Sequence, residues 1–167
     1  MNLFDPGDNP VDNLPFLATL ACTIKAVDEY ADLLRMTIAT AGNDHRLGAN
    51  EAPPAIISMF LGEELDHIIE SITDRKELED TSSERFQTGV SVIPDFSKDN
   101  TDRNRTSPFA FTGNKFEFRG VGSSQSIAGP NTILNAILAA EMEEMADLIE
   151  SGKTPMEVIK DLSLIHI

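Results

Sequence analysis

The chain has 167 residues, and its 41% of hydrophobic residues can bury a core of ordinary size. Acidic residues number 28 and basic residues 13, so the formal net charge is −15 and the summed field repels nucleic acid and anionic lipid surfaces. We therefore expect no nucleic-acid partner and no membrane partner, and the sequence carries neither a membrane-spanning apolar run nor an export signal.

The first predicted element is a helix that is entered through Asp12, Asn13 and Pro15 and ends at Gly42. Its apolar residues recur every three or four positions: Leu20, Ile24, Val27, Ala31, Leu34 and Ile38. Cys22, the single cysteine, lies in this helix and has no partner for an internal disulfide. We therefore predict that Cys22 is a core residue rather than a reactive thiol, in a protein of the reducing cytoplasm.

Two short helices are predicted next, on either side of Gly62. The first begins at Pro53-Pro54 and carries Ile56, Ile57 and Phe60, and the second carries Leu65, Ile68, Ile69 and Ile72. Acidic residues cluster from Glu63 to Glu84, which is typical of a solvated face, and we assign them no chemistry.

A sheet is predicted in the middle of the chain, with a strand at 88–93, a loop at 94–103 and then a hairpin. The hairpin joins Phe109–Thr112 to Lys115–Arg119 through Gly113-Asn114. Because side chains alternate along a strand, Phe116 and Phe118 lie on one face and Lys115, Glu117 and Arg119 on the other.

The last predicted elements are a long amphipathic helix capped by Asn131 and a short helix opened by the capping box Thr154-Pro155-Met156-Glu157. The expected fold is α+β, an antiparallel sheet with packed helices. We expect it to cover residues 1–162, and the apolar residues 163–167 to be a truncated or non-native tail.

Three groups of residues could carry chemistry. In the loop 45–54, Arg46 could hold a carboxylate or phosphate and Glu51 could remove a proton from an amine, although the two could instead pair with each other. Arg103 and Arg105 suit an anionic ligand or simple solvation. Glu117 and Arg119 could be a cation ligand beside an anion clamp, or a cross-strand salt bridge.

Other candidate patterns are weak. The glycines of residues 120–126 fit neither the P-loop nor the dinucleotide fingerprint. The three histidines, His45, His67 and His166, are not spaced like a zinc site, and we predict none of them to be a metal ligand.

These three groups, in this order, resemble the glutamine synthetase family, and two longer motifs that contain them resemble its type III branch. The motifs are Asn-Asp-His-Arg-Leu-Gly-Ala-Asn-Glu-Ala-Pro-Pro at 43–54 and Asn-Arg-Thr-Ser-Pro-Phe-Ala-Phe-Thr-Gly-Asn-Lys-Phe-Glu-Phe-Arg at 104–119. The resemblance runs from about residue 2 to about residue 162. It implies part of a catalytic domain that joins ammonium to L-glutamate with ATP through γ-glutamyl phosphate, with Mg²⁺ or Mn²⁺.

The resemblance also implies residue roles. Arg46 and Arg119 match substrate-binding arginines, and Glu51 matches the glutamate that closes over the substrate and helps to deprotonate ammonium. Arg105 matches a catalytic arginine at the ATP phosphate, and Glu117 matches a metal ligand. A further ATP-contacting arginine of the commoner type is replaced by Ala110, and Lys115 is a candidate substitute.

The resemblance departs from the commoner type in one more respect, a longer separation of Glu51 from Arg105, which indicates an acidic helical insertion at about 62–102. It also implies that other metal ligands of the site precede this chain, and we therefore expect the chain alone to be inactive. The parent enzyme is expected, by the same resemblance, to be a homo-dodecamer. Two other readings stay open: a non-catalytic acidic helical interaction domain, and a related guanidino kinase.

Overall fold

The computed structural model describes residues 1–50, 52, 54–74, 85–86, 96–97 and 107–164, with backbone alone at 85–86 and 96–97. The helices are α1 (Leu14–Glu29), α2 (Ala31–Thr37), α3 (Ala41–Asp44), α4 (Glu63–Asp74), α5 (Ala128–Glu150) and α6 (Pro155–Ser163). The strands are β1 (Met59–Phe60), β2 (Arg85–Phe86), β3 (Phe96–Ser97), β4 (Phe109–Phe111) and β5 (Phe116–Phe118).

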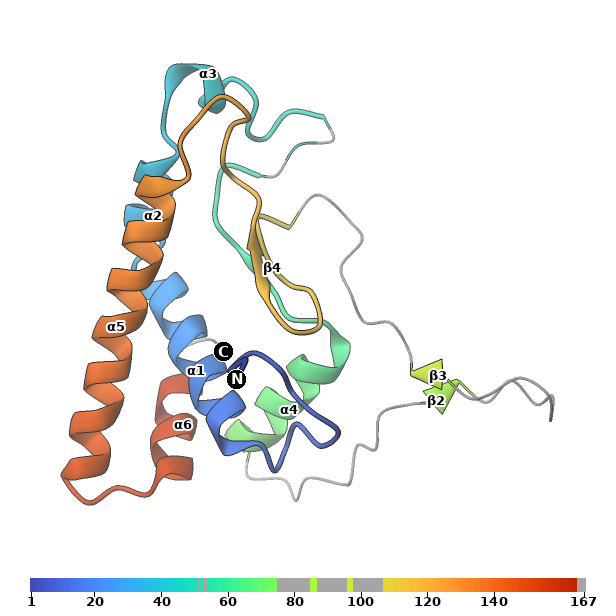
Figure 1. Ribbon diagram of the computed structural model, residues 1–167, viewed down its shortest axis with the longest axis vertical. Helices are drawn as coiled ribbons and strands as arrows, with labels where there is room; N and C mark the ends of the chain where they lie inside the picture. The colour runs from blue at the N-terminus through green and yellow to red at the C-terminus, as the bar shows by residue number, and fades with distance from the viewer. Residues whose placement is uncertain (51, 53, 75–84, 87–95, 98–106, 165–167) are drawn as a thin grey trace.

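Helix α1 lies at the centre of the molecule, between the long helix α5 and the layer that contains the sheet and α4 (Figure 1). It packs on both α5 and α6 and carries more buried apolar residues than any other described helix, including Phe16, Leu17, Leu20 and Ile24. In the described part of the chain, no helix is long and apolar enough to cross a lipid bilayer.

The predicted N-terminal helix is present as two helices. Asn13 caps α1 by accepting a hydrogen bond from the backbone N–H of Phe16 at 3.2 Å, and the predicted apolar face is buried. The helix breaks at Tyr30, and the predicted end at Gly42 is wrong, because α2 ends at Thr37. Thr40 is extended and its hydroxyl accepts from the N–H of Asn43, so it starts the separate helix α3, which contains Gly42.

The main sheet has the order β1-β4-β5. The predicted hairpin is confirmed: β4 and β5 are antiparallel, with Phe111 opposite Phe116, and Gly113 has a φ of +90° in the turn. The prediction of a purely antiparallel sheet is wrong, because β1 runs parallel to β4, with Met59 opposite Phe109. A parallel pair needs a long connection, and here the connection contains α4.

The helix predicted from Pro53-Pro54 is also wrong, because Met59 and Phe60 form β1 and Ile56 is exposed. Pairing with β4 outweighs the weak local helix signal of this short segment. The second predicted helix is confirmed as α4, which buries Leu65, Ile68, Ile69 and Ile72 and exposes acidic residues such as Glu63 and Glu70.

The remaining middle segment is described in part. The strand predicted at 88–93 and the acidic residues from 75 to 84 lie outside the described residues. The loop predicted at 94–103 contains β3, which pairs antiparallel with β2. This short pair was not predicted.

Helix α5 begins three residues earlier than the predicted cap Asn131. Pro130 lies in its first turn, where a backbone N–H has no helical partner and proline is tolerated. The capping box of α6 is confirmed: the Thr154 hydroxyl accepts from the N–H of Glu157 at 3.3 Å, and Glu157 Oε2 accepts from the N–H of Thr154 at 2.9 Å.

Removing this cap should weaken α6. We expect Thr154→Ala to lower the free energy of unfolding by about 1 kcal/mol, measured by chemical denaturation of the purified protein. Ser71→Ala is the control, because the Ser71 hydroxyl donates to the carbonyl of His67 within α4 and caps no helix. The hydrogen bonds from the Thr154 N–H and hydroxyl lower the pKa of Glu157. The contribution of the Glu157 carboxylate to folding stability is therefore complete above about pH 4.3 and is lost as the pH falls further. Equal stability of the two variants would contradict the capping role.

A buried ionic cluster joins α1 to α5. Lys25 Nζ lies 2.6 Å from Glu141 Oε2 and 3.5 Å from Glu29 Oε2, and it also donates to Glu144 Oε2. The side chains of Lys25 and Glu141 are only 7% and 2% exposed. Burial alone lowers the pKa of Lys25, but the hydrogen bonds to Glu141 and Glu144 outweigh it and hold the pKa above its ordinary value.

Cys22 lies beside this cluster and is fully buried. Burial, followed by the negative charge of Glu141, raises the pKa of its thiol to about 11. The thiol therefore stays protonated at neutral pH, and the predicted core role is confirmed.

Candidate functional site

Three charged side chains meet on one face of strand β5 and its turn. Arg119 Nη2 lies 3.2 Å from Glu117 Oε2, and Lys115 Nζ lies 3.7 Å from Glu117 Oε1. The predicted shared face is thus confirmed. Glu117 and Arg119 are two positions apart in the same segment of the chain, so their ion pair is not the cross-strand salt bridge that was the alternative prediction.

The opposite face of the hairpin is aromatic. Phe116 and Phe118 stack or tilt against Phe109 and line an apolar cavity of about 370 Å³ between the hairpin and helices α1 and α5. Lys115 reaches the edge of this cavity, whereas Glu117 and Arg119 do not line it. The aromatic face therefore holds the hairpin against the helices and leaves the charged face on the other side.

Glu117 keeps access to solvent, with its side chain 41% exposed, while Arg119 is 18% exposed. The Arg119 guanidinium is thus fixed in a half-buried position next to a carboxylate that a cation or ligand can reach. Such a pair can bind a divalent cation through Glu117 and an anionic group through Arg119.

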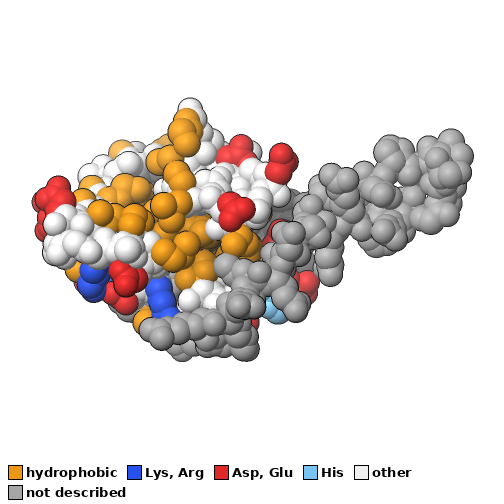
Figure 2. Space-filling view, turned by 90° about the horizontal axis from the view of Figure 1, so that it is seen from below, with side chains coloured by type: hydrophobic (Ala, Val, Ile, Leu, Met, Phe, Trp, Pro, Cys, Tyr) orange, Lys and Arg blue, Asp and Glu red, His pale blue; other side chains and the backbone are white. Residues whose placement is uncertain are grey.

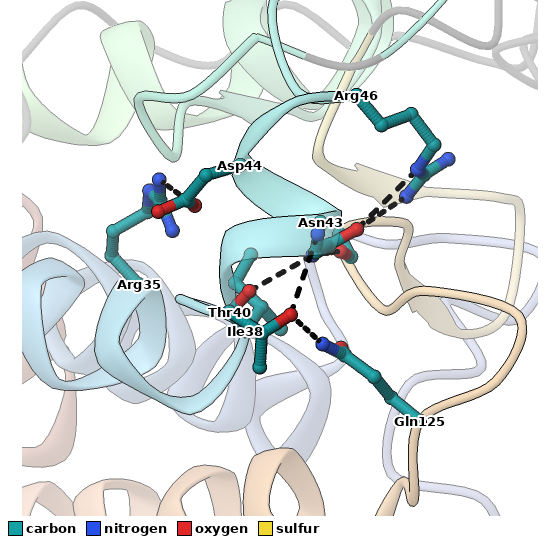
Figure 3. Close-up of polar contacts among 8 residues, drawn as sticks. Arg35, Ile38, Thr40, Asn43, Asp44, Arg46 and Gln125 are labelled. Atoms are coloured by element: carbon teal, nitrogen blue, oxygen red, sulfur yellow. Dashed lines mark hydrogen bonds and ion pairs between the residues drawn. The ribbon is translucent and has the colours of Figure 1, made fainter.

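Arg46 follows helix α3 and points toward the segment after β5. Its Nε and Nη2 atoms each donate to Asn43 Oδ1 at 3.3 Å, and Nη2 also approaches the carbonyl of Val121 at 3.5 Å (Figure 3). Val121 is two residues beyond Arg119, so the fold brings Arg46 to the same end of β5 as Arg119. The sequence separates these two arginines widely.

A network of short polar contacts holds α3 in place. Arg35 of α2 pairs with Asp44 at 2.6 Å, and the side chain of Gln125 donates to the hydroxyl of Thr40 (Figure 3). Gln125 Oε1 also accepts from the N–H of Gly122 at 3.2 Å. Sequence reasoning assigned no role to these residues or to Asn43, although Asn43 is the first residue of the first quoted motif.

Two predicted site residues, Glu51 and Arg105, lie outside the described residues. Within the described part of the chain, no group of three or more His, Cys, Asp or Glu side chains could hold a metal ion.

The surface agrees with the acidic composition. The face seen in Figure 2 has hydrophobic side chains gathered at its centre and Asp and Glu side chains around its edge, with few Lys or Arg.

Comparisons with known proteins identify relatives that match most of the chain. It is 48% identical to the type-3 glutamine synthetase of Dictyostelium discoideum over 173 residues, and this match covers 99% of the chain and 24% of that protein. The glutamine synthetases of Butyrivibrio fibrisolvens and Bacteroides fragilis (strain YCH46) are also 48% identical, over 99% and 86% of the chain. No family model matches the chain.

The chain therefore belongs to the glutamine synthetase family. Its resemblance to the type III branch is confirmed by the relative in Dictyostelium discoideum. The chain spans about a fifth to a quarter of the length of these relatives, which are named as glutamine synthetases.

Proposed function

We propose that this chain supplies part of the active site of a glutamine synthetase, which joins ammonium to L-glutamate at the expense of ATP. The observation that carries the proposal is the approach of Arg46 to Val121, just beyond the Glu117–Arg119 ion pair, in a chain that is 48% identical to type-3 glutamine synthetase. The same relationship favours this ligase over a guanidino kinase or a non-catalytic interaction domain.

The chemistry needs positive charge around a carboxylate. A carboxylate is a poor electrophile, so the γ-phosphoryl group of ATP is first transferred to the side-chain carboxylate of glutamate, and ADP leaves. Ammonia then attacks the acyl carbon, the C–O bond to phosphate breaks, and inorganic phosphate leaves. Donors fixed in advance stabilise the charge that gathers on the phosphate and the tetrahedral centre.

The described residues divide these tasks. Arg46 and Arg119 bind the anionic groups of glutamate, because each guanidinium is already oriented by a neighbouring oxygen. Lys115, whose Nζ lies 3.7 Å from Glu117 Oε1, is proposed to contact ATP phosphate in place of the arginine missing at Ala110. In this proposal Glu51 is the base that deprotonates ammonium, and Arg105 binds the ATP phosphate.

Glu117 fits a divalent cation as one ligand. Mg²⁺ in nucleotide sites is held by one or two carboxylates together with phosphate oxygens and water, so one carboxylate is a sufficient contribution from this segment. When bound, Mg²⁺ or Mn²⁺ neutralises phosphate charge. The ion pairs with Arg119 and Lys115 orient the carboxylate of Glu117.

The test uses the full-length protein that carries this sequence. We expect glutamate-dependent ATP turnover, with γ-glutamyl hydroxamate formed when hydroxylamine replaces ammonium. Arg119→Ala should lower kcat/KM for glutamate by about 10- to 100-fold, because a fixed charged donor to the substrate is lost.

The control is Lys153→Ala, which removes a cation from a surface ion pair with Asp161 at 2.7 Å and should change the activity less than about twofold. ATP turnover that depends on a guanidino acceptor, or none with any of these acceptors in a folded protein, would refute the synthetase assignment. The parent enzyme is further proposed to be cytoplasmic and to be a homo-dodecamer. Its molar mass in solution would test the number of subunits.

A further inference from the structure

The amide side chain of Asn43 is one of the few polar groups buried in the described structure, with only 5% of the residue exposed. Its Nδ2 atom donates to the carbonyl of Ile38 at 2.9 Å and to the carbonyl of Gly120 at 2.8 Å. Its Oδ1 atom accepts from Nε and Nη2 of Arg46. Both hydrogens and both lone pairs of the amide are therefore in use.

These four contacts fix the orientation of the amide. The reverse orientation would point two N–H donors at the guanidinium of Arg46, which has donors only, and the amide oxygen at two carbonyls. Asn43 therefore presents an oxygen to Arg46 and joins three places in the chain: Ile38 at the end of α2, Arg46 two residues beyond α3, and Gly120 directly after Arg119.

The contact with Arg46 uses one edge of the guanidinium. Nε and Nη2 face Asn43, and Nη2 also faces the carbonyl of Val121, so the two N–H groups of Nη1, which bond no described residue, are the donors left for a carboxylate. An arginine has many rotamers, and fixing one of them before the substrate arrives lowers the entropy lost on binding.

The neighbouring glycine leaves room for this arrangement. A Cβ atom on Gly122 would lie 3.2 Å from Asn43 Oδ1, which is closer than an ordinary contact. Any side chain at position 122 would therefore press on the atom that holds Arg46.

We propose that Asn43 is a positioning residue for glutamate binding, whose buried amide fixes the Arg46 guanidinium against the segment that follows Arg119. This inference rests on the proposed function, since it assigns the held arginine to the carboxylate of glutamate. Asn43 itself does not touch the substrate; it acts through Arg46.

The test is a double-mutant cycle in the full-length enzyme that carries this sequence, with KM for glutamate and KM for ATP measured for each variant. Asn43→Ala should raise KM for glutamate about tenfold and leave KM for ATP within about twofold, because a hydrogen bond to a charged group is lost at the glutamate side only. In an Arg46→Ala background, Asn43→Ala should change KM for glutamate less than about twofold.

Two further variants sharpen the test. Gly122→Ala should raise KM for glutamate about threefold without removing any polar group, because the new methyl group displaces the amide oxygen and so weakens a bond to a charged group. If Asn43→Ala gives no soluble enzyme, Gly122→Ala decides the question. Asn9→Ala is the control, since this exposed amide bonds only Asp12 among the described residues, at 2.6 Å, and should leave both constants unchanged.

Equal effects of Asn43→Ala in the wild-type and Arg46→Ala backgrounds would overturn the inference, because Asn43 would then act on the fold and not through Arg46. An unchanged KM for glutamate in both Asn43→Ala and Gly122→Ala would overturn it as well. Failure of the unsubstituted enzyme to use glutamate is a separate outcome, and it would refute the proposed function and with it the assignment of Arg46 to glutamate.

Discussion

Glu117→Gln in the full-length enzyme should lower kcat for glutamine formation by about 100- to 1,000-fold. Glutamine keeps the size of the side chain and can still accept from Arg119, but it removes the negative charge that we propose binds a divalent cation. The concentration of Mn²⁺ that gives half-maximal activity should therefore also rise. Both quantities are measured in one titration of activity against metal ion.

Glu150→Gln is the matched control, because Glu150 is an exposed glutamate at the end of α5, and it should leave kcat and the metal dependence unchanged. An unchanged metal dependence in Glu117→Gln would mean that Glu117 only neutralises Arg119 and Lys115. That result would remove Glu117 from the proposed metal site while leaving the substrate roles of the arginines intact.

The second large effect concerns stability. Lys25→Met should lower the free energy of unfolding by about 3 to 5 kcal/mol, because it leaves the carboxylate of Glu141 buried between α1 and α5 without its cation. The double variant Lys25→Met with Glu141→Leu should recover most of this loss, since two apolar side chains can fill the same space. Chemical denaturation of the full-length enzyme measures both.

Glu144→Gln is the control, because the side chain of Glu144 is 51% exposed and its pairing with Lys25 is weakened by solvent. We expect this variant to cost less than about 1 kcal/mol. A loss of similar size in Glu144→Gln and Lys25→Met would show that burial of Glu141 is not what makes the cluster important.

The same cluster has a defined pH dependence. Because the pKa of Lys25 is higher in the folded than in the unfolded protein, its contribution is complete below the unfolded value of about 10.4 and is lost as the pH rises through the folded value. The stability difference between wild type and Lys25→Met should therefore be constant at neutral pH and shrink above about pH 10.4.

Local patterns predicted most elements that form from nearby residues. The hairpin at Gly113-Asn114, the capping box at Thr154 and the apolar face of α4 were all predicted from residues within a few positions of each other. The parallel strand β1 was not, because its pairing partner is on β4, far along the chain. The break of the first helix at Tyr30 was also missed, since no glycine or proline marks it, and α3 was missed because its Gly42 was taken as the end of the first helix.

In the candidate site, too, the contacts within one strand were predictable and the contacts between distant segments were not. Alternation along β5 predicted that Glu117 and Arg119 share a face, because the pattern needs only the strand itself. The approach of Arg46 to Val121 and the role of Asn43 depend on how α3 packs against the segment after β5, which no local spacing encodes. The roles of Glu51 and Arg105 stay predictions.

The pairing of β1 with β4 has a consequence for how this family can vary in length. Met59 and Phe109 lie side by side, so the stretch of chain between them leaves and returns at one place on the sheet. Lengthening such a closed excursion is cheap, about 0.6 kcal/mol for each doubling. We therefore expect that relatives can differ in chain length between α4 and Arg105 without any change in the positions of Glu117 and Arg119.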